Sequence, residues 1–281
     1  MRPPVPSDPP RKWLTLARGP MAYTDVGSGP IIVGIHGCPG SVKDWRWLGV
    51  PLEANARFIR LELPGFGETP LRTGPNPSLA GRGHIFIEAL DALDIASCIV
   101  VAHSAGGLVA LEAAARYSER IQGVALIAVP GGRPHRPVRH FPQAQWVSRG
   151  LRVPGLKYVL TQLGRRAFGR AGFPDGLPSD TVRQTLHIVA HMDFQRQREN
   201  IGRIEQSTLV AWADDDQFIE AAIGQELAES LPPGPRLPFQ AGGHYIQKTQ
   251  SVEIGRTLLH WIDDAGLFSG DDRHVFEITD V

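Results

Sequence analysis

Cysteine is scarce in this chain, and so are long apolar runs and any excess of charge of one sign. Only two cysteines occur among 281 residues, Cys38 and Cys98, and two thiols cannot form a framework of several disulfides. No Cys/His cluster has the spacing of a zinc site, so neither a metal nor another cofactor is predicted. The 29 basic residues are balanced by 29 acidic ones, which gives no reason to expect nucleic acid as a partner.

The chain also lacks the sequence features of secretion and membrane insertion. Residues 1–11 are rich in proline where a secretory signal would have its apolar segment. No run approaches the roughly 18 uninterrupted apolar residues of a membrane span. Together with the low cysteine content, these absences predict a soluble, cytoplasmic protein. Its proline-rich residues 1–11 are predicted to be a disordered or extended arm.

Apolar segments of strand length alternate with segments of helical pattern along most of the chain. After a predicted antiparallel hairpin over residues 13–25, buried strands are predicted at 31–35, 56–61, 99–102, 121–129, 207–212 and 236–240. Helices are predicted at 42–55, 79–93, 108–116, 219–231 and 252–265. Such alternation predicts an α/β fold with a mostly parallel central sheet, helices on both faces, and functional loops at the carboxyl ends of the strands.

The alternation stops between residues 131 and 205. Short helical stretches separated by Gly and Pro are predicted there, at 143–148, 155–170 and 179–200, without a buried strand. This segment is predicted to be a helical cap, inserted into a core that comprises residues 12–130 and 206–266. Residues 267–281 are interpreted as a C-terminal tail.

Ser104 stands at the junction of a buried strand and a helix, in the sequence I-V-V-A-H-S-A-G-G-L. A serine on such a sharp turn projects its hydroxyl out of the sheet, and the close approach of helix and strand requires small neighbours. The stretch follows the G-x-S-x-G pattern, with Ala102 in place of the first glycine. Ser104 is therefore the candidate nucleophile.

A serine hydroxyl is a weak nucleophile at neutral pH and needs a base, which a third group must hold in the right tautomer. The loop after the predicted strand 207–212 offers three adjacent carboxylates, Asp214, Asp215 and Asp216. The loop after the last strand offers His244, preceded by two glycines. The candidates thus occur in the order Ser, Asp, His along the chain.

These motifs resemble those of the α/β-hydrolase fold superfamily, from about residue 13 to residue 266. The sequence carries H-G-C-P-G at 36–40, E-L-P-G-F-G-E-T at 62–69, the elbow at Ser104, W-A-D-D-D at 212–216 and G-G-H at 242–244. The resemblance implies a serine hydrolase whose base is His244. Its acid is then Asp216, four residues after Trp212, and Asp215 remains the alternative.

The resemblance also implies an oxyanion hole, because the tetrahedral intermediate of acyl transfer needs hydrogen-bond donors for its oxygen. One donor is expected to be the backbone N–H of Ala105, which follows the nucleophile, and the other the backbone N–H of Cys38. The side chain of Cys38 is not needed for this role. His36 and His103 are interpreted as structural groups that hydrogen-bond the loop backbones.

The predicted activity is cleavage of carboxylic esters with small to medium acyl groups, which include lipid-like esters. Haloalkane dehalogenases and epoxide hydrolases of this fold use aspartate at the elbow, so Ser104 argues against both. Carbon–carbon, thioester and lactone hydrolysis remain alternatives, although carbon–carbon hydrolases usually carry tryptophan after the base, where this chain has Tyr245. A non-catalytic, ligand-binding member of the fold is the other alternative, and it would be expected to lack a triad residue.

The predicted cap is strongly basic. Residues 131–206 contain thirteen Lys and Arg against five Asp and Glu, a net charge of about +8, whereas the rest of the chain carries about −8. Apolar residues such as Trp146 and Tyr158 are interleaved with these cations. A segment of this kind can lie on an anionic lipid surface, or it can pack its apolar side on the core and leave its arginines in water.

Overall fold

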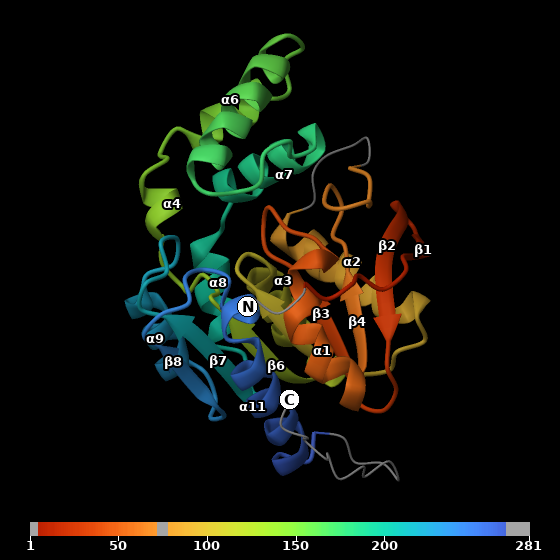
Figure 1. The fold of residues 1–281 in the computed structure, drawn as a ribbon. Helices are drawn as coiled ribbons and strands as arrows, with labels where there is room; N and C mark the ends of the chain where they lie inside the picture. Colours follow the sequence, from red (N-terminus) through yellow and green to blue (C-terminus); the bar gives the residue numbers. More distant parts are fainter. Residues whose placement is uncertain (1–4, 72–77, 268–281) are drawn as a thin grey trace.

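A single eight-stranded sheet forms the centre of the molecule in the computed structural model, which describes residues 5–71 and 78–267 (Figure 1). The strand order is β1-β2-β4-β3-β5-β6-β7-β8; β2 runs antiparallel to both of its neighbours, β1 and β4, and the six strands from β4 to β8 in this order are parallel to one another. The strands are β1 (Lys12–Leu16), β2 (Gly19–Val26), β3 (Ile31–Ile35), β4 (Arg57–Leu61), β5 (Cys98–His103), β6 (Ile121–Ile127), β7 (Thr208–Ala213) and β8 (Arg236–Phe239). The predicted fold class is confirmed.

Helices cover both faces of the sheet, because the inner strands are apolar on both sides. One face packs against α2 (Leu79–Ala92), α3 (Gly106–Arg116) and α9 (Ala221–Ser230), and the other against α1 (Arg46–Asn55) and α11 (Ser251–Asp264). Alternate residues of β5 divide between the two layers: Val100 lies in one cluster of buried apolar side chains, and Ile99 and Val101 lie in the other. Two short elements, η1 (Val42–Trp45) and α10 (Ile246–Thr249), complete the second layer.

Between β6 and β7 the described chain forms helices and no strand. These are α4 (Arg136–Arg139), α5 (Ala144–Gly150), α6 (Leu156–Arg170), α7 (Ser179–Ala190) and α8 (Phe194–Ile201). Figure 1 shows α6 and α7 standing above the carboxyl ends of the strands. Helices α5, α6 and α7 enclose a small apolar cluster of their own around Leu151, Val182 and Leu186.

The structure differs from the prediction of one helical stretch over residues 179–200. Helix α7 ends at Ala190, and α8 starts afresh at Phe194, where the Asp193 side chain accepts a hydrogen bond from the backbone N–H of Arg196. Helix α8 then packs against α3 of the core, and both Arg196 and Asn200 donate hydrogen bonds to Glu112. The last helix of the predicted cap is therefore anchored to the core.

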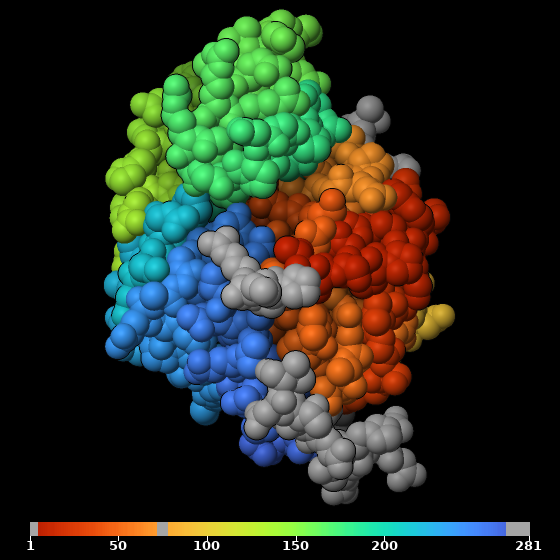
Figure 2. All heavy atoms as spheres, viewed as in Figure 1, coloured from red at the N-terminus to blue at the C-terminus, as the bar shows by residue number. Residues whose placement is uncertain are grey.

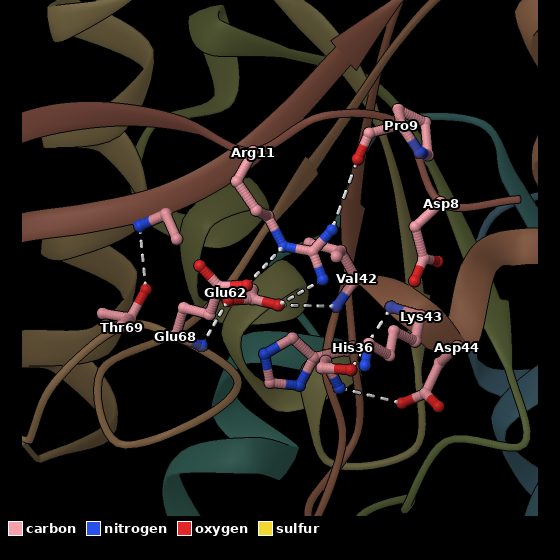
Figure 3. Close-up of polar contacts among 12 residues, drawn as sticks. Asp8, Pro9, Arg11, His36, Val42, Lys43, Asp44, Glu62, Glu68 and Thr69 are labelled. Carbon is pink, nitrogen blue, oxygen red and sulfur yellow. Dashed lines mark hydrogen bonds and ion pairs between the residues drawn. The ribbon is translucent and has the colours of Figure 1, made fainter.

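The N-terminal segment is held against the core by buried charge. Both carboxylate oxygens of Asp8 accept hydrogen bonds from the Arg46 guanidinium, at 2.6 and 2.5 Å. Arg11 lies 3.4 Å from the buried carboxylate of Glu62, which also accepts backbone N–H groups from Val42 and Glu68 (Figure 3). Residues 5–11 form no helix or strand, and ion pairs of Asp8 and Arg11 join them to the core. Residues 1–4 of the arm, and 268–281 of the predicted tail, lie outside the described residues.

None of the helices in the described ranges has the length and apolar character needed to cross a membrane.

Candidate active site

Ser104 occupies the turn between β5 and α3, at the carboxyl edge of the sheet. Its φ of +51° lies in the left-handed region, which residues with a Cβ rarely adopt, so the elbow is strained. The residues around this turn are small because the backbone segments pack closely on both sides of it. A Cβ on Gly106 would lie 2.4 Å from the carbonyl oxygen of Ile35, and one on Gly37 would lie 2.9 Å from the Cβ of Ser104.

The structure brings Ser104, His244 and Asp216 into one hydrogen-bonded chain. Ser104 Oγ lies 2.9 Å from His244 Nε2, and His244 Nδ1 lies 2.8 Å from Asp216 Oδ2. All three side chains are buried, with 8, 5 and 4% of their surface exposed. Because Nδ1–H of the neutral ring donates a hydrogen bond to the Asp216 carboxylate, Nε2 is left as the acceptor for the serine hydroxyl.

Asp216 is itself held in place. Its other oxygen, Oδ1, accepts backbone N–H groups from Phe218 and Ile219, at 2.7 and 2.9 Å. These bonds fix the carboxylate plane toward the imidazole ring.

The neighbouring carboxylate, Asp215, takes a different partner. It accepts the backbone N–H groups of Gly242 and Gly243, at 3.2 and 2.7 Å, and these bonds hold its pKa below the usual value. It therefore caps the turn that leads into His244 and does not touch the imidazole ring. Of the two candidate acids, the structure places only Asp216 against His244.

Two backbone N–H groups are available for an oxyanion. Cys38 and Ala105 line the same recess beside Ser104. Neither N–H has a protein acceptor within residues 5–71 and 78–267. The Cys38 thiol is buried, which raises its pKa to about 12 and keeps it protonated, so it is a poor nucleophile.

Two further histidines hold the loops of the site, as the sequence indicated. His36 donates from Nδ1 to the Gly37 carbonyl oxygen, at 2.7 Å, and accepts the Leu63 N–H at Nε2, at 3.1 Å. His103 donates from Nε2 to the carbonyl oxygen of His244, at 2.9 Å. Burial, together with the nearby His244, keeps the pKa of His103 well below its usual value, so its ring is neutral.

Aromatic side chains cover the imidazole, and the sequence analysis did not identify them. Phe218 packs edge-on against His244, with ring centroids 5.0 Å apart, and Phe173 of the cap stacks on Phe218 at 5.4 Å. Phe218 could have been found, since it lies two residues after Asp216 in the acid loop. Phe173 carries no local signal, because only the folded cap brings it to the site.

Comparison with known proteins identifies the family. A model of the alpha/beta hydrolase family matches residues 32–256, which include Ser104, Asp216 and His244. The chain belongs to the alpha/beta hydrolase family. The match contains the strands from β3 onward and the segment that carries the cap.

Relatives of this α/β-hydrolase include enzymes with different substrates. The chain is 26% identical to a haloalkane dehalogenase of Mesorhizobium japonicum, in an alignment 306 positions long, gaps included, that covers 96% of each chain. It is 25% identical over 260 residues to a 2-hydroxy-6-oxononadienedioate/2-hydroxy-6-oxononatrienedioate hydrolase of Paraburkholderia phymatum, with 85% of this chain and 90% of the relative covered. A thermophilic esterase from Thermogutta terrifontis has the same fold, with a TM-score of 0.73 and 19% identity over 91% of this chain and 98% of that one.

No group of three or more His, Cys, Asp or Glu side chains in the described parts of the chain is arranged to hold a metal ion.

Proposed function

We propose that this α/β-hydrolase cleaves carboxylic esters through an acyl-enzyme intermediate on Ser104. The observation that carries the proposal is the contact between Ser104 Oγ and His244 Nε2, at 2.9 Å. The other nitrogen of the same imidazole ring, His244 Nδ1, is hydrogen-bonded to the buried carboxylate of Asp216. A hydroxyl, a base and an orienting acid in this relation are the groups that acyl transfer requires.

In the first half-reaction, Ser104 Oγ attacks the ester carbonyl carbon while His244 Nε2 takes the hydroxyl proton. The carbonyl oxygen becomes an oxyanion, which the N–H groups of Cys38 and Ala105 stabilise. The intermediate then collapses, the bond to the alcohol oxygen breaks, and His244 returns the proton to the leaving alcohol. Asp216 stabilises the transient imidazolium and stays ionised.

In the second half-reaction, water attacks the acyl-enzyme and gives its proton to His244. The new tetrahedral intermediate releases the carboxylic acid, and the proton returns to Ser104. Each cycle consumes one water and one ester and yields one acid and one alcohol.

The residue at the elbow separates this proposal from dehalogenation. The M. japonicum relative is a haloalkane dehalogenase, and enzymes of that kind in this fold use aspartate at the elbow. This chain has Ser104 there, and a serine ether formed by alkyl transfer could not be hydrolysed as an ester can.

Carbon–carbon, thioester or lactone cleavage is the second candidate class, favoured by the P. phymatum relative. All three can proceed on the same triad, so the substrate and not the triad distinguishes them. Tyr245 after the base weighs against carbon–carbon cleavage, because tryptophan is usual there. A ligand-binding member without catalysis would not need Ser104, Asp216 and His244 all in place.

The test is hydrolysis of a chain-length series of p-nitrophenyl esters by the wild type, by Ser104→Ala and by Ser148→Ala. Ser148 is the matched control, a buried serine whose Oγ lies 3.2 Å from the Nδ1 of His187, outside the site. We expect activity in the wild type and in Ser148→Ala, and a loss of at least about a thousandfold in Ser104→Ala. An inactive wild type, or a Ser104→Ala variant as active as the wild type, would contradict the proposal.

A further inference from the structure

Arg82 is a buried cation that has no counter-charge among the described residues. Its side chain projects from α2, only 9% of the residue is exposed, and its Nε is buried without a hydrogen-bond partner. Within the described residues the guanidinium forms no ion pair. Burial of this kind lowers the pKa of Arg82 to about 10, which still leaves the group charged at neutral pH.

No carboxylate of the described residues pairs with Arg82. Among the described residues, the thiol of Cys38 is the one ionisable group close to Arg82 that could carry a negative charge. Burial keeps that thiol protonated and therefore neutral. The segment before α2, residues 72–77, has the sequence R-T-G-P-N-P and contains no acid. A buried, unpaired charge is strongly unfavourable, so the site calls for an anion from outside the chain.

Arg82 lies in the wall of the recess that contains the oxyanion donors. The recess is narrow, and it is lined by Cys38, Ala105, Leu108, Val109, Ile188 and Arg82, among others. A second recess adjoins it and shares Arg82, Leu63 and Phe66. There the carboxamide of Gln184 on α7 is buried, and its Oε1 has no partner in the described structure. The recess therefore has apolar sides and a polar end.

The position of His244 tells which half of an ester enters this recess. The leaving alcohol must lie against His244 Nε2 to receive its proton. Neither His244 nor the aromatic side chains that cover it, Phe218 and Phe173, line the recess with Arg82. The acyl half is the part that extends past the oxyanion donors toward Arg82.

We propose that Arg82 binds a carboxylate at the far end of the acyl group, so that the preferred substrates are half-esters of short dicarboxylic acids. The inference rests on the ester hydrolysis proposed above. The side chains along the recess are apolar, like a methylene chain, and a planar guanidinium can form two parallel hydrogen bonds with a carboxylate.

The experiment compares two ethyl esters, monoethyl glutarate and ethyl hexanoate, by release of ethanol. Their acyl chains are equally long when a terminal carboxylate oxygen of glutarate is counted with its five carbons. We expect the wild type to favour monoethyl glutarate by at least about tenfold in kcat/KM, as a charge-assisted hydrogen bond predicts. Arg82→Met should lose this preference, so that its ratio of kcat/KM for the two esters falls at least about tenfold. Arg149→Met, which removes an exposed arginine of the cap, is the matched control and should keep the wild-type ratio.

The outcomes separate the two proposals. Turnover of ethyl hexanoate that depends on Ser104, without a preference for the half-ester, would overturn the role of Arg82 and leave ester hydrolysis standing. Turnover of neither ester would count against ester hydrolysis itself. If Arg82→Met does not fold, the wild type alone decides: glutarate must inhibit ethyl hexanoate hydrolysis more strongly than hexanoate does, and the reverse order overturns the inference.

A second inference comes from the outer surface of the cap, which exposes aromatic and aliphatic side chains together. Trp146 and Tyr158 are 71 and 70% exposed. Six of the ten large apolar side chains that are exposed in the described structure belong to residues 146–163: Trp146, Val153, Leu156, Tyr158, Val159 and Leu163. We call these six residues the cap surface. Figure 2 shows that this part of the chain forms one end of the molecule.

The charges around the cap surface have one sign. Residues 120–174 contain no Asp or Glu. Five exposed cations lie in or beside α5 and α6 without an ion pair to any described residue: Arg149, Arg152, Lys157, Arg166 and Arg170. Arg149 stacks over the exposed ring of Trp146, with its guanidinium carbon 5.2 Å from the ring centroid.

We infer that the cap surface binds an anionic lipid surface. Tryptophan and tyrosine are suited to the interface between headgroups and acyl chains, and cations near an anionic surface add electrostatic attraction. Because no acidic side chain interrupts the segment, repulsion from the lipid phosphates is small there.

Co-sedimentation with vesicles tests this inference. The wild type should sediment with phosphatidylcholine vesicles that contain phosphatidylglycerol, and binding should fall at high salt and with phosphatidylcholine alone. Trp146→Ala/Tyr158→Ala should lower binding at least about tenfold, whereas Trp13→Ala, which removes an exposed tryptophan of β1, should not. Equal binding by both variants would overturn the inference. So would a lipid-free wild-type dimer that Trp146→Ala/Tyr158→Ala disperses, since it would assign the surface to a second copy of the chain.

Discussion

The carboxylate of Asp216 lies 2.8 Å from Nδ1 of His244, on the opposite side of the ring from Ser104, while the adjacent Asp215 binds the backbone just before that histidine. One carboxylate therefore orients the ring, and the other orients the turn that carries it.

The two aspartates should differ sharply on substitution. Asp216→Asn should lower kcat by about a thousandfold or more, because the amide no longer stabilises the imidazolium and favours the wrong tautomer. Asp215→Ala should lower kcat by no more than about tenfold, since only hydrogen bonds to Gly242 and Gly243 are lost. Steady-state kinetics with one p-nitrophenyl ester measures both. A loss in Asp215→Ala as large as that in Asp216→Asn would contradict the assignment of the acid.

His103 should act through position and not through proton transfer. Its Nε2–H bond to the His244 carbonyl oxygen is lost in His103→Leu, for which we expect about a tenfold lower kcat. Burial and the neighbouring His244 keep the pKa of His103 well below its usual value, so the ring is uncharged at neutral pH. The pH–rate profile of His103→Leu should therefore keep the wild-type shape. A changed apparent pKa in that profile would show that His103 titrates in the reaction.

The strands, and the loops that carry the catalytic candidates, could be predicted from the sequence because they depend on local pattern. The run at 31–35 became β3 with the predicted bounds, and the elbow serine, the acid loop and the glycine-flanked histidine all lie at the carboxyl edge of the sheet. Ala102, in place of the usual glycine, is compatible with the elbow because it lies within the buried strand β5.

Features that depend on distant contacts were not predicted. The short helices α4 and α10 have too few residues to show a period, and the break before α8 depends on the cap at Asp193. Arg82 lies in a helix pattern like any solvated cation, and only the folded structure shows that it is buried next to Cys38 and Ala105. The ion pairs that fix residues 5–11 likewise join positions far apart in sequence, as Asp8 and Arg46 show.

Close contact at the elbow should make Gly106 intolerant of a side chain. Gly106→Ala places a Cβ 2.4 Å from the Ile35 carbonyl oxygen, so helix α3 must move away from β3. We expect the free energy of unfolding to fall by about 2 kcal/mol, with a loss of activity because Ser104 shifts. Gly202→Ala is the control, since its Cβ would be no closer than 3.5 Å to its neighbours. Urea denaturation measures the free energy of unfolding of both variants. Equal stability of Gly106→Ala and Gly202→Ala would contradict the packing argument.

Glu112 should link the attachment of α8 to pH. Burial raises its pKa, but hydrogen bonds from Arg196 and Asn200 outweigh this, and the pKa lies below the ordinary 4.5. The stabilisation is therefore fully present above about pH 4.5 and is lost as the pH falls through the lower folded-state pKa. Glu112→Gln should lower the free energy of unfolding by about 2 kcal/mol at pH 7.

This difference between Glu112→Gln and the wild type should shrink in acid, and denaturation at pH 7 and at about pH 3 measures it. A difference that stays constant with pH would show that the charge of Glu112 does not hold α8.

Covalent labelling tests the central claim, that Ser104 is the nucleophile, most directly. The wild type is treated with a fluorophosphonate, digested, and mapped by mass spectrometry, beside Ser104→Ala and Ser148→Ala. We predict a single phosphonylated peptide that contains Ser104, in the wild type and in Ser148→Ala, and no label in Ser104→Ala. An unlabelled wild type, or a label that persists in Ser104→Ala, would contradict the account.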